Sequence, residues 1–512
     1  MRYRPGWLVD IGLILLAVGS RAAFASPLLY DHDSFLFARA VVNYDLSAGV
    51  PHPPGYILYV LLGRLLAHLT QDVNQGLIWV GILSGALAGI CIYRLGRRIF
   101  GAGVGVIGAL FYLLGPMIWF YHEIALTYAA EGAFSALVAL LAWRTYRGSK
   151  GGAYLLCVAL GVAGGIRPWL IPQLLPLWLL AFWRFGVWRA VLGLGLVVIS
   201  SLSWLVPNAA SAGGMAAYFS LVRNYGGGLL SEGHLGSLAG TVSAARMMGL
   251  WFYLTFGWAL AGLIWLLARR WILRKPSSLR VQSGVRIFFA CWILPAFLLR
   301  LFAHLTMPGY LLIFLPGICL LAAAGIFLAA EDCAAVLGRI LPPSSGLRFL
   351  GRSQAILGIF LVGILAHHVT TFTMGDSGFT WPIIQAKNRI IHERLEFVRG
   401  FSPQETVVFA SDMANAAHYY LSDYRVINVF WTPGEQRFGP DRPPQERARW
   451  VILFDSQLLS VNGSRESVKR ESLPVEVPIF YFALSAGEEV ARWKGGYRLV
   501  KAAENHFSAA PE

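Results

Sequence analysis

Charge is scarce in this sequence of 512 residues: only 13% of them are Asp, Glu, Lys or Arg, whereas 56% are hydrophobic. Soluble globular proteins carry about 25% charged residues. The apolar residues run in long stretches, and about 20 of them in a row are enough to cross a bilayer. The composition therefore excludes a soluble enzyme and a disordered chain, and it predicts a polytopic α-helical membrane protein.

Cysteine is scarce as well. The sequence has five cysteines, and none of them lies in residues 371–512. No pair of cysteines has the spacing of metal ligands, and a disulfide framework is not expected from so few.

Acidic residues are distributed unevenly along the chain. Residues 371–512 hold 16 Lys and Arg against 17 Asp and Glu, whereas residues 1–370 hold 26 against 10. A basic excess can indicate nucleic-acid binding, but in a membrane protein it collects in the cytoplasmic loops. We therefore interpret residues 1–370 as a transmembrane domain that contacts membrane lipids and no nucleic acid.

Hydrophobicity and charge together predict about eleven spans, with the N-terminus in the cytoplasm and the tail outside the plasma (inner) membrane. The stretch 55–69 is short and contains Arg64 and His68, so we expect a helix that lies along the outer interface. The predicted spans cover residues 7–25, 76–95, 102–120, 124–143, 152–166, 168–183, 190–207, 247–268, 286–303, 309–329 and 352–370.

The tail, residues 371–512, is predicted to be a small α/β domain outside the cytoplasm. Its stretch 383–399 is amphipathic, and the stretches 406–410, 425–429 and 450–454 resemble short strands.

The predicted outer loop 26–75 carries an acidic motif. Asp31 and Asp33 flank His32, and Asp45 follows in the same loop. Carboxylates close to lipid are costly and tend to be functional. Asp33 is therefore a candidate catalytic residue. Asp31 and Asp45 are either substrate-binding residues or members of a solvated loop.

A rigid segment follows the acidic motif, His52-Pro53-Pro54-Gly55-Tyr56. Prolines stiffen a backbone, and glycine permits a sharp turn. Alone, the segment could be a junction between a loop and a helix. Together with the acidic motif about 20 residues before it, the segment is a more specific signal of a functional site.

Asp33-Ser34 followed by this segment resembles the first outer loop of bacterial membrane glycosyltransferases of the GT-C class, in their protein O-mannosyltransferase-like branch. Further segments that fit extend the resemblance over about residues 1–330, although each is weak alone. They are Glu123-Ile124-Ala125-Leu126-Thr127-Tyr128, Gly165-Ile166-Arg167-Pro168 and His304-Leu305-Thr306-Met307-Pro308-Gly309-Tyr310-Leu311-Leu312.

The resemblance implies the GT-C fold and a reaction. A sugar would pass, with inversion, from a polyprenyl-phosphate donor to a hydroxyl acceptor on a protein, a lipid or a glycan. Asp33 matches the catalytic position and would be the general base that takes the hydroxyl proton. The leaving lipid phosphate needs a cation, for which Arg39, Arg167 and His304 are candidates. Arg167 is favoured because a guanidinium can bind phosphate through two hydrogen bonds. The alternative for Arg167 is an interfacial anchor at a helix end, and the alternative for Arg39 is an amphipathic helix that faces lipid headgroups.

The other substrate-binding candidates are His52, Tyr56, Glu123 and Tyr310. His52 and His304 are each either a ligand or a structural hydrogen-bonding residue. Tyr56 and Tyr310 either stack on a sugar or belong to an interfacial aromatic belt.

A metal site made of Asp31, His32 and Asp33 is the less favoured alternative, because no further ligand is evident. No cofactor is therefore expected.

Two other functions remain open. A lipid or glycan transporter or flippase would need charged residues inside the spans and often has two related halves, and neither is evident. A non-catalytic membrane scaffold could bind a partner through its tail, but it would not need Asp33 beside a rigid proline turn.

Overall fold

The structure is a computed structural model. It describes residues 6–183, 185–231, 233–271, 279, 283–303, 307–340, 348–428 and 449–455, and strands at 469–471, 479–483, 488–493 and 496–501. The chain folds into two compact units. Unit 1 comprises Met1–Pro27 and Ala40–Ile383, and unit 2 comprises Leu28–Arg39 and Ile384–Glu512.

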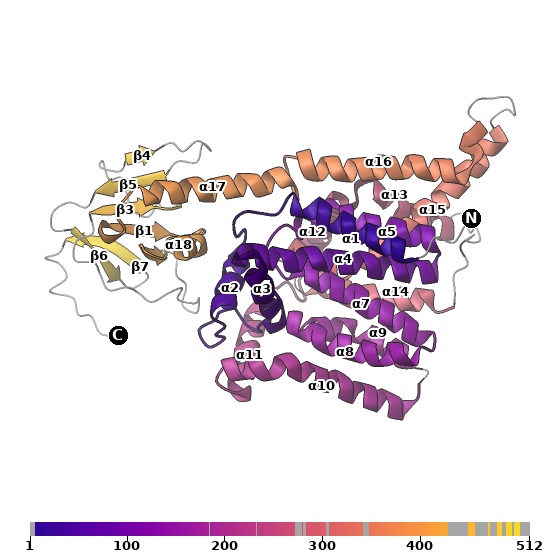
Figure 1. The fold of residues 1–512 in the computed structure, drawn as a ribbon, viewed down its shortest axis with the longest axis horizontal. Helices are drawn as coiled ribbons and strands as arrows, with labels where there is room; N and C mark the ends of the chain where they lie inside the picture. The colour runs from indigo at the N-terminus through magenta and orange to yellow at the C-terminus, as the bar shows by residue number, and fades with distance from the viewer. Residues whose placement is uncertain are drawn as a thin grey trace. The chain divides into compact units, whose positions relative to one another are not determined.

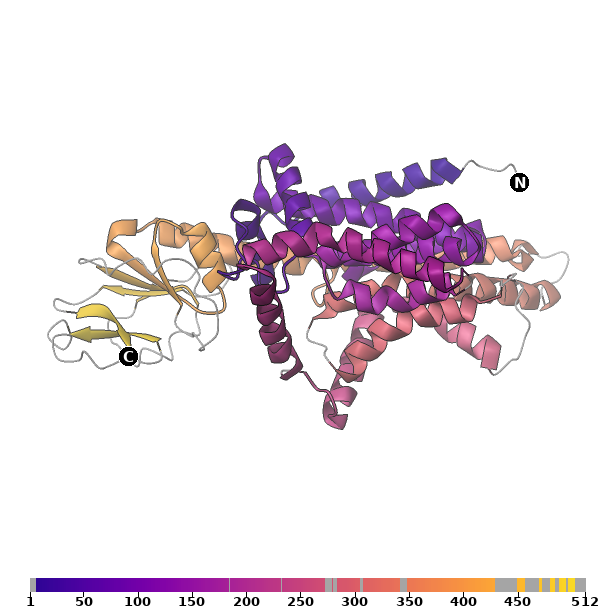
Figure 2. The same cartoon turned by 90° about the horizontal axis from the view of Figure 1, so that it is seen from below.

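Unit 1 is a bundle of helices (Figures 1 and 2). Its α-helices are α1 (Gly6–Ala22), α3 (Ile57–Thr70), α4 (Val73–Ile99), α5 (Ala102–Leu114), α6 (Pro116–Phe120), α7 (Tyr128–Tyr146), α8 (Lys150–Ile166), α9 (Leu170–Phe182), α10 (Val187–Ser211), α11 (Met215–Ser231), α12 (Leu238–Phe256), α13 (Leu260–Trp271), α14 (Val285–Phe302), α15 (Leu315–Ile340) and α16 (Ser353–Met374). Helix α2 (His32–Val42) and helix α17 (Trp381–Arg399) each begin in one unit and end in the other.

Length and hydropathy show which helices can cross a bilayer. Among the described residues, six are long and apolar enough: Val73–Ile99, Val187–Ser211, Leu238–Arg269, Val285–Phe302, Leu315–Ile340 and Ser353–Met374. Shorter apolar helices are Ile57–Thr70, Ala102–Leu114, Lys150–Ile166 and Leu170–Phe182. The chain is a multi-pass helical membrane protein. The count of eleven spans and the interfacial position of α3 stay predictions.

Two predicted spans are interrupted, because glycine and proline break their helices. The stretch 102–120 divides at Gly115 into α5 and α6, with Pro116 at the first position of α6. Proline lacks an N–H, and it therefore suits the first turn of a helix but not its interior. The stretch 247–268 divides at Gly257, whose φ of 46° ends α12 before a 3₁₀ turn (Gly257–Ala259) leads into α13. Helix α11 was not predicted.

Small residues let α4 and α5 approach closely. A Cβ atom added to Gly96 would lie 2.6 Å from Gly105 Cα. Helices in membranes often pack through such small residues.

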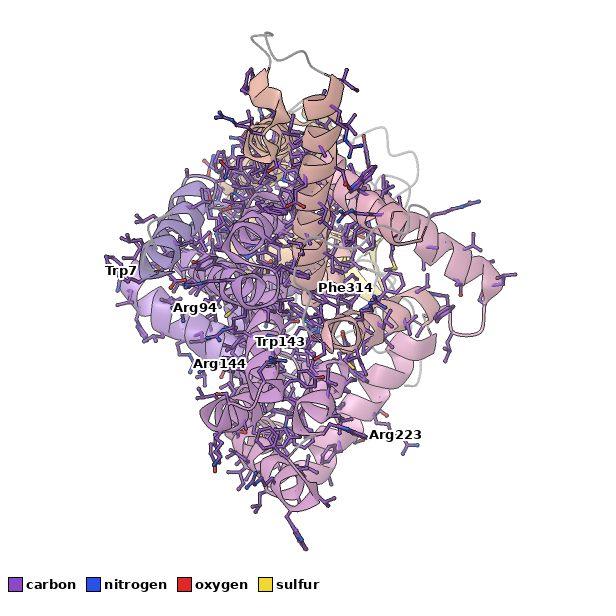
Figure 3. All side chains as sticks on the ribbon, turned by 90° about the vertical axis from the view of Figure 1, so that its right-hand side faces the viewer. Trp7, Arg94, Trp143, Arg144, Arg223 and Phe314 are labelled. Atoms are coloured by element: carbon purple, nitrogen blue, oxygen red, sulfur yellow. The ribbon has the colours of Figure 1, made fainter. Side chains whose placement is uncertain are left out.

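Basic side chains gather at one end of unit 1. In the end-on view of Figure 3, the labelled side chains of Arg94 on α4 and Arg144 on α7 both lie on the left. Arg97 and Arg98 lie in the last turn of α4, and Arg144 lies in the last turn of α7. This gathering is the pattern that the positive-inside rule produces.

Unit 2 contains a five-stranded sheet with the order β2-β1-β3-β5-β4. Its strands are β1 (Thr406–Ala410), β2 (Arg425–Asn428), β3 (Trp450–Leu453), β4 (Lys469–Glu471) and β5 (Ile479–Ala483), and β6 (Glu488–Trp493) pairs with β7 (Gly496–Lys501). Strand β1 is parallel to β2 and β3, whereas β5 is antiparallel to β3 and β4. The three predicted strands are therefore present.

The core of unit 2 is formed by strand β1, helices α17 and α18, and the start of residues Leu28–Arg39. We call Leu28–Arg39 the acidic segment, because it contains Asp31 and Asp33. Helix α18 (Ala414–Tyr420) follows β1, and α17 buries Ile384, Ile391, Leu395 and Val398 at helical spacing. Val407 and Val408 of β1 are fully buried. Leu29 of the acidic segment is also fully buried, which explains why Leu28–Arg39 belongs to this unit.

Candidate functional site

The predicted site residues fall into separate groups. His52, Tyr56, Arg167 and Tyr310 are brought together in unit 1. Glu123 contacts a different set of residues in that unit. Asp31, Asp33 and Arg39 lie in unit 2, and His304 lies outside the described residues.

Side chains of two helices donate hydrogen bonds to the backbone of the segment His52–Tyr56, which we call the proline-rich turn. Tyr218 of α11 donates a hydrogen bond to the Pro54 carbonyl at 2.9 Å, and Asn208 of α10 donates to the same oxygen at 3.3 Å. Tyr44 donates to Asn208 Oδ1 at 2.7 Å. Gly55 has a φ of +82°, and a Cβ there would lie 2.7 Å from the Tyr44 hydroxyl. Only glycine suits this position.

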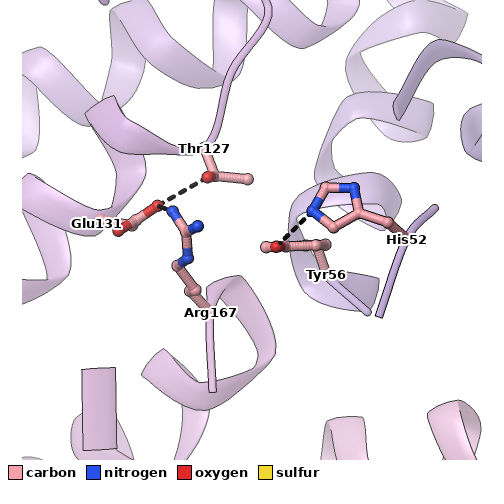
Figure 4. Close-up of polar contacts among 5 residues, drawn as sticks. All are labelled: His52, Tyr56, Thr127, Glu131 and Arg167. Atoms are coloured by element: carbon pink, nitrogen blue, oxygen red, sulfur yellow. Dashed lines mark hydrogen bonds and ion pairs between the residues drawn. The ribbon is translucent and has the colours of Figure 1, made fainter. Parts of the chain in front are cut away.

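A buried ion pair joins α7 to the end of α8 (Figure 4). Arg167 Nη1 donates to Glu131 Oε1 at 2.7 Å, and the side chains are 11% and 0% exposed. Thr127, just before α7, donates to the same carboxylate oxygen at 2.7 Å. Glu131 lies in the first turn of α7, where the helix dipole favours a negative charge.

Three tyrosines surround the Arg167 guanidinium. Its Cζ lies 5.7 Å from the ring centre of Tyr56, 5.5 Å from Tyr128 and 4.8 Å from Tyr310. Tyr56 and Tyr310 are buried, so neither belongs to a lipid-facing aromatic belt. Cation–π contacts of this kind hold a guanidinium in a fixed place.

A second guanidinium contacts Tyr310. Arg300, in the last turn of α14, places its Cζ 4.2 Å from the Tyr310 ring centre. Arg300 is buried, and within the described part of the chain its Nε has no hydrogen-bond partner. Tyr310 therefore contacts two guanidinium groups.

The charges of this cluster do not balance. Arg167 pairs with Glu131, but no carboxylate of the described residues forms an ion pair with Arg300. Buried charges are normally paired. We define Tyr56, Tyr128, Glu131, Arg167, Arg300 and Tyr310 as the arginine–tyrosine cluster. Its excess positive charge can bind an anion.

His52 is a neighbour of this cluster. Its Nε2 shares a 2.8 Å hydrogen bond with the Tyr56 hydroxyl (Figure 4). The His52 ring also lies 5.5 Å from the ring of Tyr225 on α11. The structure shows His52 positioning Tyr56.

Glu123 belongs to another buried polar group. Its carboxylate is fully buried and, among the described residues, accepts no hydrogen bond. Arg21 of α1 is also fully buried, and its positive charge acts on the Glu123 carboxylate. Arg21 donates to the Leu113 carbonyl at 2.6 Å.

The acidic motif begins helix α2. Asp31 Oδ1 accepts from the Asp33 N–H at 3.2 Å, and the Ser34 hydroxyl accepts from the Asp31 N–H at 3.3 Å. This reciprocal arrangement is a helix N-cap. Asp31 therefore fixes the first turn of α2, which carries Asp33.

The Lys387 ammonium and the Asp31 carboxylate interact electrostatically in unit 2. Burial raises the pKa of Asp31, and the neighbouring Asp33 raises it further, whereas the Lys387 ammonium lowers it. Burial lowers the pKa of Lys387. The Lys387 Nζ also lies 4.2 Å from the ring centre of Tyr30.

Asp45 and Arg39 have simpler surroundings. The Asp45 carboxylate accepts from the Ser47 hydroxyl and from two backbone N–H groups of its exposed turn, and these hydrogen bonds lower its pKa. Burial lowers the pKa of Arg39. Asp45 thus has a local role in its turn.

Metal binding is not tested by the structure. Among the described residues, no group of three His, Cys, Asp or Glu side chains could hold a metal ion.

Sequence reasoning missed Tyr128, Glu131 and Arg300. A signal existed for Arg300, because an arginine within an apolar span is costly and tends to be functional. The same signal existed for Glu131, a carboxylate inside the predicted span 124–143. Tyr128 ends one of the segments that fit the family resemblance, but spacing and composition did not single it out.

One stretch of the chain matches a family of known proteins. Residues 41–188 match the family model of the protein O-mannosyl-transferase TMEM260 N-terminal domain. The protein O-mannosyl-transferase tmem260 of Dictyostelium discoideum is 27% identical over 103 residues, which are 19% of this chain and 13% of that protein. The matched residues 41–188 include Tyr56, Glu131 and Arg167.

Solved structures resemble the fold over nearly the whole chain. ArnT from Cupriavidus metallidurans, bound to undecaprenyl phosphate, has a TM-score of 0.58 at 14% identity, covering 94% of this chain and 98% of ArnT. The Archaeoglobus fulgidus oligosaccharyltransferase in its apo form has a TM-score of 0.52 at 14% identity, covering 89% of this chain and 70% of that enzyme.

These findings support a GT-C, protein O-mannosyltransferase-like family. At this identity, the likeness to the solved structures establishes the fold.

Proposed function

We propose that this protein transfers a sugar from a polyprenyl-phosphate donor to a hydroxyl acceptor on the outer face of the membrane. The observation that carries the proposal is the arginine–tyrosine cluster, which holds two buried guanidinium groups for one carboxylate. The fold supports it, because ArnT has the same fold and was solved with undecaprenyl phosphate.

The donor phosphate is the anion that this cluster would bind. A phosphate leaving group gains negative charge as the bond to the sugar breaks, and a preorganised cation stabilises that charge. Arg167 is held by Glu131 and three rings, so its position costs little to maintain during the reaction. Arg300 can offer its fork of N–H donors to phosphate oxygens.

The tyrosines serve two roles in this proposal. Their rings hold the guanidinium groups, and their faces offer apolar surface to a sugar or to the first prenyl unit. His52 keeps the Tyr56 hydroxyl in place through the 2.8 Å hydrogen bond.

Asp33 is the proposed general base. It would take the proton of the acceptor hydroxyl as the oxygen attacks the anomeric carbon, and the phosphate would leave with the electron pair of the broken bond. Attack opposite to the leaving group inverts the anomeric configuration. Asp33 suits this role because Asp31 and Ser34 fix the helical turn that carries it.

The acceptor is proposed to be a protein, lipid or glycan hydroxyl. The matching family model describes protein O-mannosyl-transferases, so mannose and a serine- or threonine-containing peptide are the first donor sugar and acceptor to test.

The experiment uses the full chain purified in lipid nanodiscs. Undecaprenyl-phosphate mannose with radiolabelled mannose is supplied together with a cell-envelope extract as the acceptor source. The proposal predicts that label moves to the extract and that free undecaprenyl phosphate appears in equal amount. Binding of undecaprenyl phosphate without turnover for any supplied sugar would contradict transfer and favour a transporter.

A further inference from the structure

The acidic segment Leu28–Arg39 is far in sequence from the other residues of unit 2. It nevertheless belongs to the same compact unit as Ile384–Glu512. Leu29 and His32 of this segment form hydrogen bonds with Tyr420 and Asn415. These partners lie 391 and 383 positions later in the chain.

The segment is held at its backbone. The Leu29 N–H donates a hydrogen bond to the Tyr420 hydroxyl of α18 at 2.9 Å. Leu29 is fully buried, and a buried N–H needs such a partner. Tyr420 therefore fixes the chain just before the acidic motif.

The segment is also held at its side chains. His32 Nδ1 and Asn415 Nδ2 share a 2.7 Å hydrogen bond. Phe35 is buried, and its ring centre lies 5.9 Å from those of both Tyr419 and Tyr420. These contacts lie on both sides of Asp33.

Lys387 of α17 provides a third contact. Its ammonium lies over the Tyr30 ring and acts on the Asp31 carboxylate. Asp31 caps the turn that carries Asp33. The charge of Lys387 therefore acts on the cap, and through the cap on the position of Asp33.

The part of unit 2 that contacts the segment is itself firmly attached to the sheet. Asp455, two residues after the end of β3, accepts hydrogen bonds from the Ser411 and Met413 N–H groups, between β1 and α18. These groups lie at the carboxyl ends of the parallel strands β1 and β3. This is the edge at which α/β domains usually bind ligands. Here the helix that follows this edge holds a segment of the same chain.

We infer that the C-terminal α/β part of unit 2 is a positioning device for the acidic segment, in which Asn415, Tyr420 and Lys387 hold α2 so that Asp33 is fixed. The catalytic consequence rests on the proposed role of Asp33, but the positioning itself does not. These three are positioning residues, because they act through Asp31 and the segment.

Hydrogen–deuterium exchange of the full chain tests the positioning directly. Tyr420→Phe keeps the ring and removes the acceptor of the Leu29 N–H. We expect exchange of the peptide covering residues 28–39 to rise about 2- to 10-fold, the range for losing one hydrogen bond. Tyr420→Phe combined with Asn415→Ala should raise it further. Arg399→Gln, which removes an exposed pair with Glu396 on α17, is the matched control and should leave it unchanged.

Enzyme kinetics test the catalytic effect of misplacing Asp33. In the double variant, kcat should fall about 10-fold or more, whereas the KM for the donor should change less than about 2-fold, because a misplaced base affects the transition state and not donor binding. Lys387→Arg keeps the charge and should retain more activity than Lys387→Gln.

Unchanged exchange of residues 28–39 in both the single and the double variant would overturn the inference. Faster exchange with unchanged kcat would leave positioning intact and instead overturn the proposed role of Asp33. If the double variant does not fold, Tyr420→Phe alone decides the result through exchange.

Discussion

The Arg167 guanidinium and the Glu131 carboxylate form a 2.7 Å ion pair with Glu131 fully buried. Such a pair is costly to bury and is seldom the most stable choice for a protein interior. Arg167 and Arg300 both contact Tyr310. Under the proposed function, the pair is kept because this cluster binds the donor phosphate.

Arg167 and Glu131 should behave as a pair in stability. Arg167→Leu leaves a buried carboxylate without its partner and should lower the free energy of unfolding by about 3–5 kcal/mol. Arg167→Leu combined with Glu131→Leu should recover much of that loss, yet it should not recover binding of undecaprenyl phosphate. Thermal unfolding and lipid-binding measurements on the same samples check both results. Additive losses in the double variant would contradict the pairing.

Replacing Arg300 should weaken donor binding more than it lowers the free energy of unfolding, because no carboxylate of the described residues forms an ion pair with Arg300. Arg300→Gln should weaken binding of undecaprenyl phosphate about 10- to 100-fold, since a charge-assisted hydrogen bond is worth about 1.5–3 kcal/mol. Arg147→Gln, at the opposite end of α7 from Glu131, is the matched control. Equal affinity of the Arg300 and Arg147 variants would remove Arg300 from the site.

Gly55→Ala should damage the proline-rich turn. The new Cβ would meet the Tyr44 hydroxyl and the Asn208 amide at a φ of +82°. We expect a loss of about 1–3 kcal/mol in stability, measured as a lower unfolding temperature. Gly101→Ala, also at positive φ but with open space around it, separates backbone strain from the steric clash. A loss no larger than that of Gly101→Ala would show that the close approach is unimportant.

Lys387 should set the acidic limb of the pH profile. The Lys387 ammonium lowers the pKa of Asp31, so Lys387→Gln should raise that pKa and let Asp31 accept a proton at higher pH. A protonated Asp31 caps α2 less well, and activity should therefore begin to fall at a higher pH than in the wild type. The rate of sugar transfer between pH 4 and pH 8 checks the shift. A shift toward lower pH, or none relative to Arg399→Gln, would contradict it.

Much of the helical architecture could be predicted from the sequence, because a long apolar stretch indicates a helix that can cross the membrane and basic loops indicate where such helices end. The interruptions at Gly115 and Gly257 were not predicted, although Gly115-Pro116 and Gly257 are residues that often end a helix. Helix α11 was missed because its polar residues and three consecutive glycines give it no long apolar stretch.

The site was predictable only in part. His52, Tyr56, Arg167 and Tyr310 do lie together, whereas Glu131 and Arg300 join them only through the packing of α7, α8 and α14. The attachment of the acidic segment to α18 depends on residues almost four hundred positions apart. No local pattern encodes a contact of that range.

The rate of sugar transfer by Asp33→Asn tests the central claim most directly. The substitution keeps the size of the side chain and removes its basicity, so the rate should fall about 10²- to 10⁴-fold. Binding of undecaprenyl phosphate should be unchanged, because the base acts on the acceptor hydroxyl. Asp376→Asn, an exposed acidic residue between α16 and α17, is the matched control and should keep full activity. If Asp33→Asn retains more than about a tenth of the wild-type rate, Asp33 is not the general base.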